Sequence, residues 1–561
     1  MSTFTDTLVH GNEHSFHPET LTPMQKLTLK YVVFGLVYYA FAVIEGMLLR
    51  INAVEPQELL FPDRYYAMLT AHPLVGIFGS SYLLVFGAFT FLLPYLMHKP
   101  LWSYRLANWT LWLIVVGVFT FWLDGFITHY APLYTLYWPL PADFDQFEPV
   151  AGAIFITGIA LVMVGTLLFV LNVFKTISYT PEGWTRQPPG RLLGDALGLT
   201  TLKLFFTGKL SRSKEQDHLV SLPVAAIARG TVDVLFNAGV ILFTGVLILV
   251  YMVAEILGTS LRTSAVDALL YKNWYWWGLD LVADGLVLVF VAGTWYLLAQ
   301  LITGREVFMA RWARFALGLE VVVSWTVWSH HLLSDQGQPA ALKMGSGEFV
   351  TAFELITQGL AFFIVLVTLW QARPLTMSNP LKFLIGGLLG FALAVPAGIM
   401  QADAGLNRIL HNTQWVIGPH VHVAVLVGLT MTLYAAVYLL LPLLTNGAEL
   451  YSQRLATVHF WCHLVGGIGM GAFMGMAGLQ GMLRRTIYYE GEFQPYMVLA
   501  AISGFLLLVA LLVFLYNIVM TLGLSGAVGL FRRSPLPPSV LVPGTDLAVQ
   551  PETATTGAGK E

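Results

Sequence analysis

Five histidines lie inside apolar segments of membrane length, in three clusters along the chain. They are His72 within LTAHPLVG, the pair His330 and His331 within WTVWSHHLL, and His420 with His422 within VIGPHVHVAVL. An ionisable side chain at membrane depth costs free energy and is usually retained for a function. Imidazole is also the commonest metal ligand in proteins. The three clusters therefore predict metal centres buried between helices.

The amino-acid composition places this chain in a lipid bilayer. Of its 561 residues, 57% are hydrophobic and only 11% are charged, whereas a soluble domain carries about 25% charged residues. The formal net charge of −3 is too small to suggest a nucleic-acid partner. The N-terminal residues are polar and show no signal-peptide pattern. We therefore expect an integral membrane protein.

The chain holds a single cysteine, Cys462, and this excludes three kinds of site. One cysteine cannot form a disulfide within the chain, a CxxCH covalent haem attachment or a copper centre with two cysteine ligands. A redox centre of any of these kinds must therefore lie on a partner protein.

The apolar segments predict an all-α fold with twelve transmembrane helices, because about 20 apolar residues suffice to span a bilayer. The predicted helices cover residues 27–50, 65–97, 104–125, 149–175, 223–257, 273–302, 306–333, 348–372, 381–402, 411–443, 455–483 and 494–523. We expect three regions, namely a cytoplasmic N-terminal segment 1–26, a membrane domain 27–523 and a Pro-rich cytoplasmic tail 524–561.

Loop charges orient the predicted helices. Seven Lys and Arg residues lie from Lys175, at the end of the fourth helix, to Lys214 before the fifth, whereas the loop between the third and fourth helices has none. The positive-inside rule then places both termini in the cytoplasm. At about 1.5 Å of rise per residue, this orientation puts all five histidines in the outer half of the bilayer. One shared buried site requires such a common depth.

His420 and His422 are two residues apart on one predicted helix, so their side chains point about 200° apart. They cannot readily bind one metal, but they can serve two centres on opposite sides of the helix. His72, on a different helix, can complete an axial pair with one of them.

This pattern resembles the catalytic subunit of the haem-copper oxidoreductase superfamily, and the resemblance covers essentially the whole twelve-helix region. In that family, a histidine of the second helix and the second histidine of an H-x-H motif hold a low-spin haem. The first histidine of H-x-H holds a high-spin haem. The resemblance thus implies two haems, with the b type favoured. His72 and His422 would hold the low-spin haem, and His420 would hold the high-spin haem.

Further residues match the groups that lie near the haem propionates in this family. In the segment HNTQWVIGPHVH, His411 is such a residue, although its distance along the chain from His420 is one residue longer than the resemblance leads us to expect. Arg484 and Arg485, at the outer end of the predicted eleventh helix, match the family's propionate-binding arginines. Two guanidinium groups suit two carboxylates.

His330 and His331 match the family's adjacent pair that binds a non-haem metal facing the high-spin haem. The third histidine normally comes from the sixth helix, which here reads NWYWWGLDLVADGLVLVF and has none. Its tryptophans and its later acid-glycine pair resemble the nitric oxide reductase pattern W-W-x-x-H-x-W-V-E-G. On this alignment Asp280 replaces the histidine ligand and Asp284 replaces the glutamate.

Glu354, in the segment GEFVTAFELITQG, matches a second glutamate of nitric oxide reductases. Asp284 or Glu354 would bind the metal or deliver protons, so both join Asp280 as candidate catalytic residues. Carboxylates combined with imidazoles suit iron, and copper stays an alternative because the affinity of N and O sites generally peaks at copper.

A missing tyrosine distinguishes two reactions. Oxygen-reducing members carry a redox-active tyrosine, usually within H-P-E-V-Y on the sixth helix. Here Tyr275 precedes the expected ligand position, and the predicted seventh helix has no tyrosine. Four-electron cleavage of O₂ needs that extra electron and proton, whereas coupling of two NO molecules does not. The sequence therefore favours 2 NO + 2 e⁻ + 2 H⁺ → N₂O + H₂O, with electrons passing from the low-spin to the high-spin haem.

The resemblance also implies partners and a location. A small membrane-anchored subunit with a c-type haem or a dicopper centre would supply electrons, with a soluble cytochrome c or a cupredoxin upstream of it. Quinol is disfavoured as a direct donor because the chain shows no long N-terminal extension. The expected location is the cytoplasmic membrane of a bacterium or archaeon.

Three alternatives stay open at this point. Two belong to the same superfamily, namely a terminal oxidase that reduces O₂ and a relative that disproportionates NO. The third is of another class, a polytopic metal or proton transporter whose histidines relay protons or bind a transition metal. The transporter would hold no haem.

Overall fold

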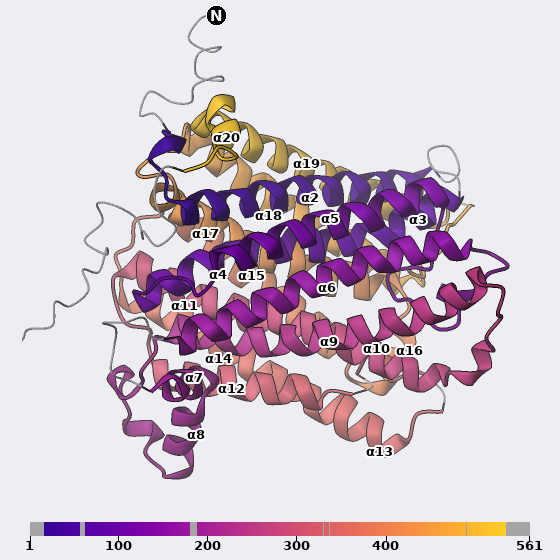
Figure 1. The fold of residues 1–561 in the computed structure, drawn as a ribbon, viewed down its shortest axis with the longest axis horizontal. Helices are drawn as coiled ribbons and strands as arrows, with labels where there is room; N and C mark the ends of the chain where they lie inside the picture. The colour runs from indigo at the N-terminus through magenta and orange to yellow at the C-terminus, as the bar shows by residue number, and fades with distance from the viewer. Residues whose placement is uncertain are drawn as a thin grey trace, which may run out of the picture.

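A computed structural model of the chain describes residues 16–55, 62–179, 188–328, 330–335, 337–489 and 491–534. Within these ranges the regular structure is helical, and the one β-type contact is an isolated antiparallel bridge between Thr413 and Leu483. The long helices lie side by side along the longest axis of the molecule (Figure 1). The predicted all-α bundle is thereby confirmed.

Eleven helical segments within the described ranges are long and apolar enough to cross a membrane. They are α2 (Pro23–Val54), α3 to α4 (Pro62–Met97), α5 (Tyr104–Thr128), α6 (Pro149–Ser178), α9 (Leu222–Ile256), α10 to α11 (Ala268–Thr303), α13 to α14 (Ala340–Gln371), α15 (Asn379–Ile399), η10 to α17 (Val416–Leu444), α18 (Gln453–Leu479) and α19 (Gln494–Leu522). A shorter helix of 17 residues, α12 (Ala310–Thr326), occupies the place of the predicted seventh helix. The order of the twelve predicted helices is therefore retained.

Short helices precede the spans, lie between them or follow them. They are α7 (Pro189–Leu197), α8 (Leu199–Phe206), α16 (Ala404–Leu410), α20 (Leu524–Gly529), η1 (Pro18–Thr20), η3 (Leu140–Ala142), η4 (Leu210–Arg212), η5 (Glu215–Asp217), η6 (Thr263–Ala265) and η8 (His330–Leu332). Helix α20 occupies the start of the region predicted as a tail. The rest of that tail from residue 535, and residues 1–15 of the N-terminal segment, lie outside the described residues.

Four of the spans change between α and π winding along their length. The π segments are η2 (Val75–Ser81) shortly after His72, η7 (Ala283–Val289) around Asp284, η9 (Lys343–Val350) just before Glu354, and η10 (Val416–Leu429) around His420 and His422. Turns of this kind are rare and frequently occur at functional sites. Each of these four adjoins a residue that the sequence analysis singled out.

Side-chain caps and prolines determine where several spans begin. Helix α2 starts at Pro23 after a capping box in which Thr22 and Gln25 exchange hydrogen bonds of 2.9 and 3.2 Å. Ser103 and Ser452 cap α5 and α18 with a single bond each, in which the serine hydroxyl accepts from a backbone N–H at 3.2 Å. These bonds satisfy N–H groups that the first helical turn leaves without a partner. The predicted start of α5 is confirmed, and the predicted starts of α2 and α18 are wrong by four and two residues.

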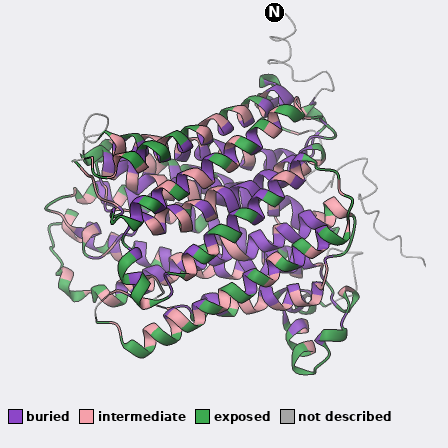
Figure 2. Ribbon diagram, turned by 180° about the vertical axis from the view of Figure 1, so that it is seen from behind, coloured by how far each residue is buried: buried purple, intermediate pink, exposed green. Residues whose placement is uncertain are grey.

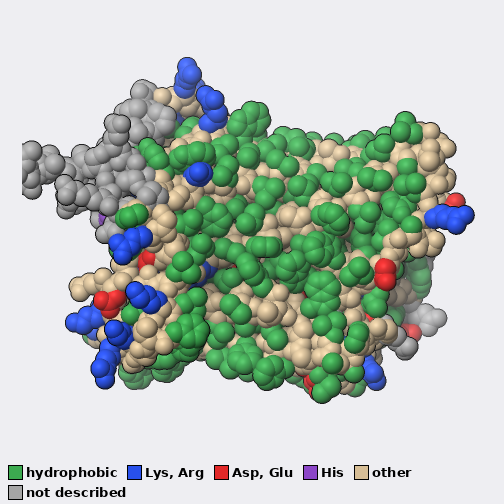
Figure 3. All heavy atoms as spheres, turned by 60° about the horizontal axis from the view of Figure 1, so that its bottom comes forward, with side chains coloured by type: hydrophobic (Ala, Val, Ile, Leu, Met, Phe, Trp, Pro, Cys, Tyr) green, Lys and Arg blue, Asp and Glu red, His purple; other side chains and the backbone are tan. Residues whose placement is uncertain are grey.

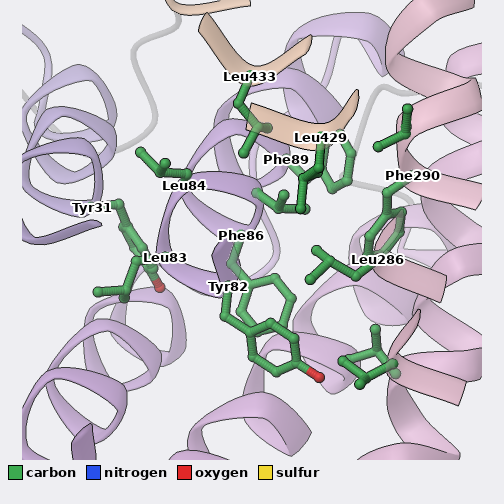
Figure 4. Packing of buried hydrophobic residues seen from close by; sticks show 14 of the residues in the cluster. Tyr31, Tyr82, Leu83, Leu84, Phe86, Phe89, Leu286, Phe290, Leu429 and Leu433 are labelled. Carbon is green, nitrogen blue, oxygen red and sulfur yellow. The ribbon is translucent and has the colours of Figure 1, made fainter. Parts of the chain in front are cut away.

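Large apolar side chains fill the space between the helices. Buried residues concentrate in the interior, and exposed residues line the outer sides of the long helices (Figure 2). Tyr82, Phe86 and Phe89 of α4 extend towards Leu286 and Phe290 on the next layer of helices (Figure 4). The Phe89 and Phe290 ring centroids are 4.8 Å apart. This packing holds α4 against the helix that carries Asp280 and Asp284.

Glycines let some helices approach backbone to backbone. A Cβ on Gly117 of α5 would lie 2.6 Å from the carbonyl O of Gly158 on α6, and a Cβ on Gly158 would lie 2.8 Å from the carbonyl O of Gly117. Small residues at helix contacts are typical of membrane bundles, where van der Waals packing drives association.

The predicted seventh helix is wrong at its C-terminal end, because α12 stops at Thr326. Ser346 Oγ donates to the carbonyl O of Thr326 (2.6 Å) and accepts from the backbone N–H of Trp328 (2.5 Å). These bonds replace partners that a further helical turn would supply. His330 and His331 consequently lie beyond the helix, in the 3-10 turn η8.

Candidate functional site

His72 of α3 and His422 of η10 face each other in the interior of the bundle. Their ring centroids are 6.1 Å apart, and the ring planes are within 15° of parallel. Two imidazoles on opposite sides of one iron have about this separation, because each metal–nitrogen bond is about 2.0 Å and each nitrogen lies about 1.1 Å from its ring centre. The pair therefore fits the axial ligands of one haem.

Hydrogen bonds determine which nitrogen of each ring is available to a metal. Nδ1 of His72 lies 2.9 Å from the carbonyl O of Ala42, and Nδ1 of His422 lies 2.6 Å from the carbonyl O of Ile417. Because a carbonyl oxygen can only accept, each Nδ1–H must be the donor. Nε2 of each ring then keeps the lone pair that binds a metal.

His420 and His422 face different helices, as the H-x-H spacing predicts. His422 faces His72 of α3, whereas His420 contacts α15. Its Nδ1–H donates to the carbonyl O of Ala394 on α15 (3.3 Å). His420 is also close enough to His331 and Asp280 for their charges to act on it. The two histidines of the motif thus serve two neighbourhoods, with His420 on the side of the candidate metal ligands.

His72 and His420 are both seated in notches made by an alanine and a glycine four residues later. His72 donates to Ala42 and packs against Gly46, where a Cβ would lie 3.1 Å from its ring. For His420 the corresponding distance at Gly398 is 2.5 Å. Residues i and i+4 lie above one another on a helix, so the alanine carbonyl and the bare glycine backbone receive one ring together.

Asp280 of α10 contacts His331 of η8, with 2.5 Å between Oδ1 and Nε2. Asp280 is buried. The ring of Trp276, one turn earlier on α10, packs against the His331 ring with centroids 4.3 Å apart. Two donors that share a metal lie about 3 Å apart when each bond is about 2.1 Å. If the Asp280 carboxylate and the His331 imidazole moved slightly apart, one metal ion could therefore bind to both.

The predicted three-residue metal site is only partly described. The side chain of His330 lies outside the described part of the structure. Among the described side chains, no group of three His, Cys, Asp or Glu residues is arranged to hold a metal ion. The pair of Asp280 and His331 alone supplies fewer ligands than a transition metal takes. The metal site stays a prediction.

His411 does not lie within the tenth span, where the prediction put it. Asp403 caps the separate short helix α16, and the span begins only at Val416. His411 directly follows α16, with its Nδ1 3.3 Å from Oε1 of Gln401 and its ring centroid 5.9 Å from that of His331. The residue predicted near the propionates therefore also adjoins the candidate metal pair.

Arg484 and Arg485 lie beyond α18 and not on its last turn. The helix ends at Leu479, and Gly481 follows in the left-handed conformation (φ 95°), which glycine adopts readily. The backbone N–H of Arg484 donates to the carbonyl O of Asn412 (2.9 Å), and its Nη2 donates to Asn412 Oδ1 (3.3 Å). The arginine pair is thereby fixed beside the segment that leads into η10.

Each of the two guanidinium groups has an N–H donor without a hydrogen-bond partner in the described structure. Nε of Arg484 and Nε of Arg485 are buried and have no hydrogen-bond partner within the described structure. Burial and the neighbouring charge of Arg485 lower the pKa of Arg484 to about 10, so it stays a cation at neutral pH. Buried cations with unsatisfied donors suit carboxylates, and haem propionates are carboxylates. The arginine pair thus fits its predicted role.

Asp284 lies among four carboxyl groups, of which the sequence analysis connected only those of Asp280 and Glu354 to it. Its electrostatic neighbours are Glu354, Glu320, Asp280 and Asp233. Asp233 on α9 and Glu320 on α12 are fully buried. One carboxyl oxygen each of Asp233, Asp284 and Glu320 has no hydrogen-bond partner in the part of the chain that is described. Neighbouring carboxyl groups of this kind can hold and pass on protons.

Thr357 of α14 links two members of this group. Its Oγ1 donates to the Glu320 carboxylate and also lies 3.0 Å from the carbonyl O of Glu354. In the sequence, Glu320 is one acid in an apolar run, no different from Glu45, which instead accepts from Trp122 Nε1 (2.7 Å). Only the tertiary packing distinguishes the two.

Arg50 is a second residue that the sequence reasoning missed. It lies on the last turns of α2, is buried, and acts electrostatically on both His72 and His422. Its Nη1 lies 3.5 Å from Sδ of Met497. A lone cation at the end of an apolar run is typical of an interfacial residue, so the sequence carries no signal for this position.

Replacement of either facing histidine tests the axial pair. We expect His72→Ala and His422→Ala each to remove the low-spin haem and to leave the high-spin haem bound. The measurement is haem per chain by pyridine haemochrome, together with the low-spin EPR signal. His463→Gln is the control, because its Nε2 is committed to the carbonyl O of Leu426 (2.7 Å). Retention of both haems in His72→Ala would rule out the pairing.

The notches predict an effect of a single methyl group. Gly398→Ala is expected to displace His420 and to lower the amount of CO-binding high-spin haem, because overpacking a tight contact costs about 1–3 kcal/mol. Gly46→Ala, with its longer Cβ distance, should perturb the low-spin haem less. Gly359→Ala is the control, since its Cβ would meet nothing within 4 Å. Equal CO binding in Gly398→Ala and Gly359→Ala would contradict the notch.

Known proteins resemble this chain over nearly its whole length. It is 25% identical over 511 residues to cytochrome c oxidase polypeptide 1 of Halobacterium salinarum, covering 89% of this chain and 78% of that protein. It is 24% identical over 506 residues to cytochrome c oxidase subunit 1 of Thermostichus vulcanus, covering 88% and 82%. A heme-copper oxidase subunit I+III of Aeropyrum pernix is 24% identical over 521 residues, covering 89% and 57%.

A solved structure and a family profile also match this chain. A solved structure of a heme-copper terminal oxidase dimer superposes with a TM-score of 0.67 at 17% identity, covering 92% of this chain and 85% of that chain, and this likeness concerns the fold. The profile of the family "Cytochrome C and Quinol oxidase polypeptide I" matches residues 26–506. The transporter hypothesis is thereby set aside. The chain belongs to this family of haem-copper respiratory oxidoreductases.

Proposed function

We propose that this chain is the catalytic subunit of a membrane-bound nitric oxide reductase, which converts two NO molecules, two electrons and two protons into N₂O and water. The observation that carries the proposal is the contact between the Asp280 carboxylate and His331 (2.5 Å). We infer that this carboxylate takes the role of the third histidine that the family resemblance leads us to expect.

The tyrosines near this region support a two-electron reaction. The nearest tyrosine to Asp280 along α10 is Tyr275, whose hydroxyl donates to the carbonyl O of Tyr134 in the loop after α5 (2.7 Å). Helix α12 contains no tyrosine. Reduction of O₂ to water takes four electrons, whereas coupling of two NO takes two. The lack of a tyrosine on α12 and after Asp280 on α10 therefore favours the two-electron reaction, and the tyrosine beside Trp276, Tyr137, comes from the loop after α5.

Two haems and one further metal complete the proposed centre. The proposed ligands are His72 and His422 for the low-spin haem, His420 for the high-spin haem, Asp280, His330 and His331 for the metal, and His411, Arg484 and Arg485 for the propionates. When bound, these groups supply the electrons and the metal sites to which NO binds. The b type is favoured for the haems. Carboxylate and imidazole donors suit iron, with copper as the alternative.

The chain's own contribution is to orient one ligand and to deliver protons. The Asp280 carboxylate and the Trp276 ring hold the His331 imidazole from two sides. Asp284 and Glu354 are electrostatic neighbours of Asp280, and each can carry a proton on a carboxyl oxygen. Two protons are consumed for each N₂O formed. We therefore assign Asp284 and Glu354 to proton delivery.

Reduction of O₂ is the second candidate, because the relatives named above are cytochrome c oxidases. Such an oxidase would use the same three haem histidines with Asp280 as an unusual ligand. A relative that disproportionates NO would also share these positions. All three reactions need the same fold, so the gas that is consumed decides between them.

The proposed enzyme draws its electrons from outside this chain. A small membrane-anchored subunit with a c-type haem or a dicopper centre is the proposed donor, since the single Cys462 excludes both kinds of centre here. A soluble cytochrome c or a cupredoxin would stand upstream of it. We place both termini in the cytoplasm, on the positive-inside rule.

Gas consumption by the purified protein tests the proposed function. With ascorbate and a redox mediator as donor, we expect NO to disappear under anaerobic conditions with one N₂O formed for each two NO. Oxygen uptake under air should be much slower. Heat-treated protein controls for direct reaction of the mediator with NO. Rapid O₂ uptake without N₂O formation would replace the proposal with the terminal oxidase.

Metal content tests the role of Asp280 separately from turnover. We expect Asp280→Ala to lose the non-haem metal and Asp280→His to retain it, because a histidine restores a donor at that position. Asp284→Asn, which keeps the side-chain shape, should retain the metal and lose turnover. The measurement is iron and copper per chain by elemental analysis, beside haem content. Full metal occupancy in Asp280→Ala would show that Asp280 is not a ligand.

A further inference from the structure

The segment between α6 and α9 carries a basic, partly apolar hairpin that the proposed reaction does not use. Helices α7 and α8 project from one end of the bundle beside α12 (Figure 1). Lys and Arg side chains gather at this end of the molecule, whereas the middle of the same face is apolar (Figure 3). The hairpin therefore lies at the basic end of the spans.

Helix α8 presents an apolar arc to its surroundings. Leu199, Leu202, Phe205 and Phe206 are exposed, and Phe206 is the most exposed of them at 81%. At about 100° per residue these four side chains cover about 120° of the helix. Thr201, about 40° beyond Phe205 around the helix, is buried against the protein. A short helix with one apolar arc facing outwards suits contact with lipid rather than with water.

The depth of α8 follows from one ring contact. Phe205 stacks on Phe315 of α12, with ring centroids 4.7 Å apart and planes 26° from parallel. Phe315 is five residues into α12, or about 8 Å along its axis. Amphipathic helices at a membrane surface bury their apolar face by roughly 5–10 Å. Since α12 stands among the spans, α8 lies at the level of the lipid head groups.

The charges beside the arc have one sign. Lys203, Lys209, Arg212 and Lys214 are all exposed. Residues 196–214 contain no Asp or Glu. Clusters of four or more basic residues on or beside an amphipathic helix are typical of binding to anionic lipids. The acid that follows, Glu215, is paired with Arg314 of α12 and does not neutralise the cluster.

The hairpin is held firmly enough to act as a fixed element. Asp195 of α7 contacts His218 (3.1 Å) and accepts from the backbone N–H groups of Leu219 (2.7 Å) and Val220 (3.0 Å). Burial raises the pKa of Asp195, but hydrogen bonds from His218, Thr200 and the backbone N–H of Val220 outweigh it and lower the pKa to about 2. Arg229 of α9 donates to the carbonyl O of Ala196 (3.2 Å). The position of α8 is therefore set by the bundle itself.

We propose that α8 and the basic residues 203–214 form an interfacial anchor that binds anionic phospholipid at the basic end of the bundle. The apolar arc enters the acyl boundary next to α12, and the four cations pair with lipid phosphates. A phospholipid surface fits better than a protein partner, because the arc continues the lipid-facing side of α12, where Val322 and Trp325 are also exposed.

Site-directed spin labels on the full chain in nanodiscs test the immersion of the arc. Cys462→Ser removes the native cysteine, and labels are placed by Leu202→Cys and Phe206→Cys. Val246→Cys on α9 serves as the lipid-facing control and Gln216→Cys as the water-facing control, both positions being exposed. We expect the α8 labels to be open to oxygen and closed to a water-soluble nickel chelate, like Val246→Cys. Labels as open to nickel as Gln216→Cys, or closed to both reagents, would overturn the anchor.

Lipid retention tests the charge. In nanodiscs of phosphatidylglycerol and phosphatidylcholine, we expect the parent chain to retain phosphatidylglycerol preferentially after detergent extraction, measured by lipid mass spectrometry. Lys203→Gln, Lys209→Gln, Arg212→Gln and Lys214→Gln together should lower this enrichment roughly twofold or more. The control changes four exposed arginines at the same end to Gln, namely Arg105, Arg454, Arg532 and Arg533. An equal loss in both variants would assign the effect to net charge and refute the site.

Discussion

An imidazole N–H in a bilayer must find its acceptor within the protein, because lipid offers none. In this chain backbone carbonyls of Ala42, Ile417 and Ala394 accept from the Nδ1–H groups of the three haem-site histidines. That bond sets the tautomer and leaves Nε2 for a metal. The arrangement of the bundle around the site follows from it, since α2 and α15 must each bring a carbonyl to the ring and a glycine beside it. Within the π-wound η10, the ring of His422 bonds the carbonyl O five residues earlier, that of Ile417.

The buried carboxyl groups of the site also need hydrogen-bond partners within the protein, but some of their oxygens have none in the described structure. An acid in an apolar interior is costly unless it is hydrogen-bonded. Asp233 accepts from Trp325 Nε1 (3.2 Å), Glu320 accepts from Thr357, and Asp280 contacts His331. Each of Asp233 and Glu320 still has one oxygen without a partner in the described structure. Groups that fall short of full satisfaction on several neighbouring helices are retained for chemistry rather than for stability. This supports a proton-handling role for the group as a whole.

Periodicity and spacing predicted the spans and the histidine pairs, because both depend on local sequence. An apolar run of span length has only one stable form in lipid, and an H-x-H spacing always separates two rings.

Tertiary contacts decided what local sequence could not. Ser346 ends α12 from another segment, so His331 lies in a turn. Asp403 starts a separate helix, so His411 precedes the tenth span. The pairing of Asp233 with the helix that carries Asp284 joins residues far apart in sequence. The spacing of alanine and glycine in each notch is visible in the sequence. The sequence does not show that a histidine of another helix packs there.

The choice between NO and O₂ depends on a few side chains rather than on the fold. Relatives near 25% identity carry the name of cytochrome c oxidase, whereas the proposal of NO rests on residues of the site. Replacing a neutral imidazole by a carboxylate changes the charge of the metal site by about one unit, which favours a harder ion and a lower potential. A carboxylate at Asp280 and the lack of a tyrosine on α12 act in the same direction, because both remove something that a four-electron reaction uses. The family and the named relatives favour an oxidase, so the proposed reduction of NO rests on these side chains alone.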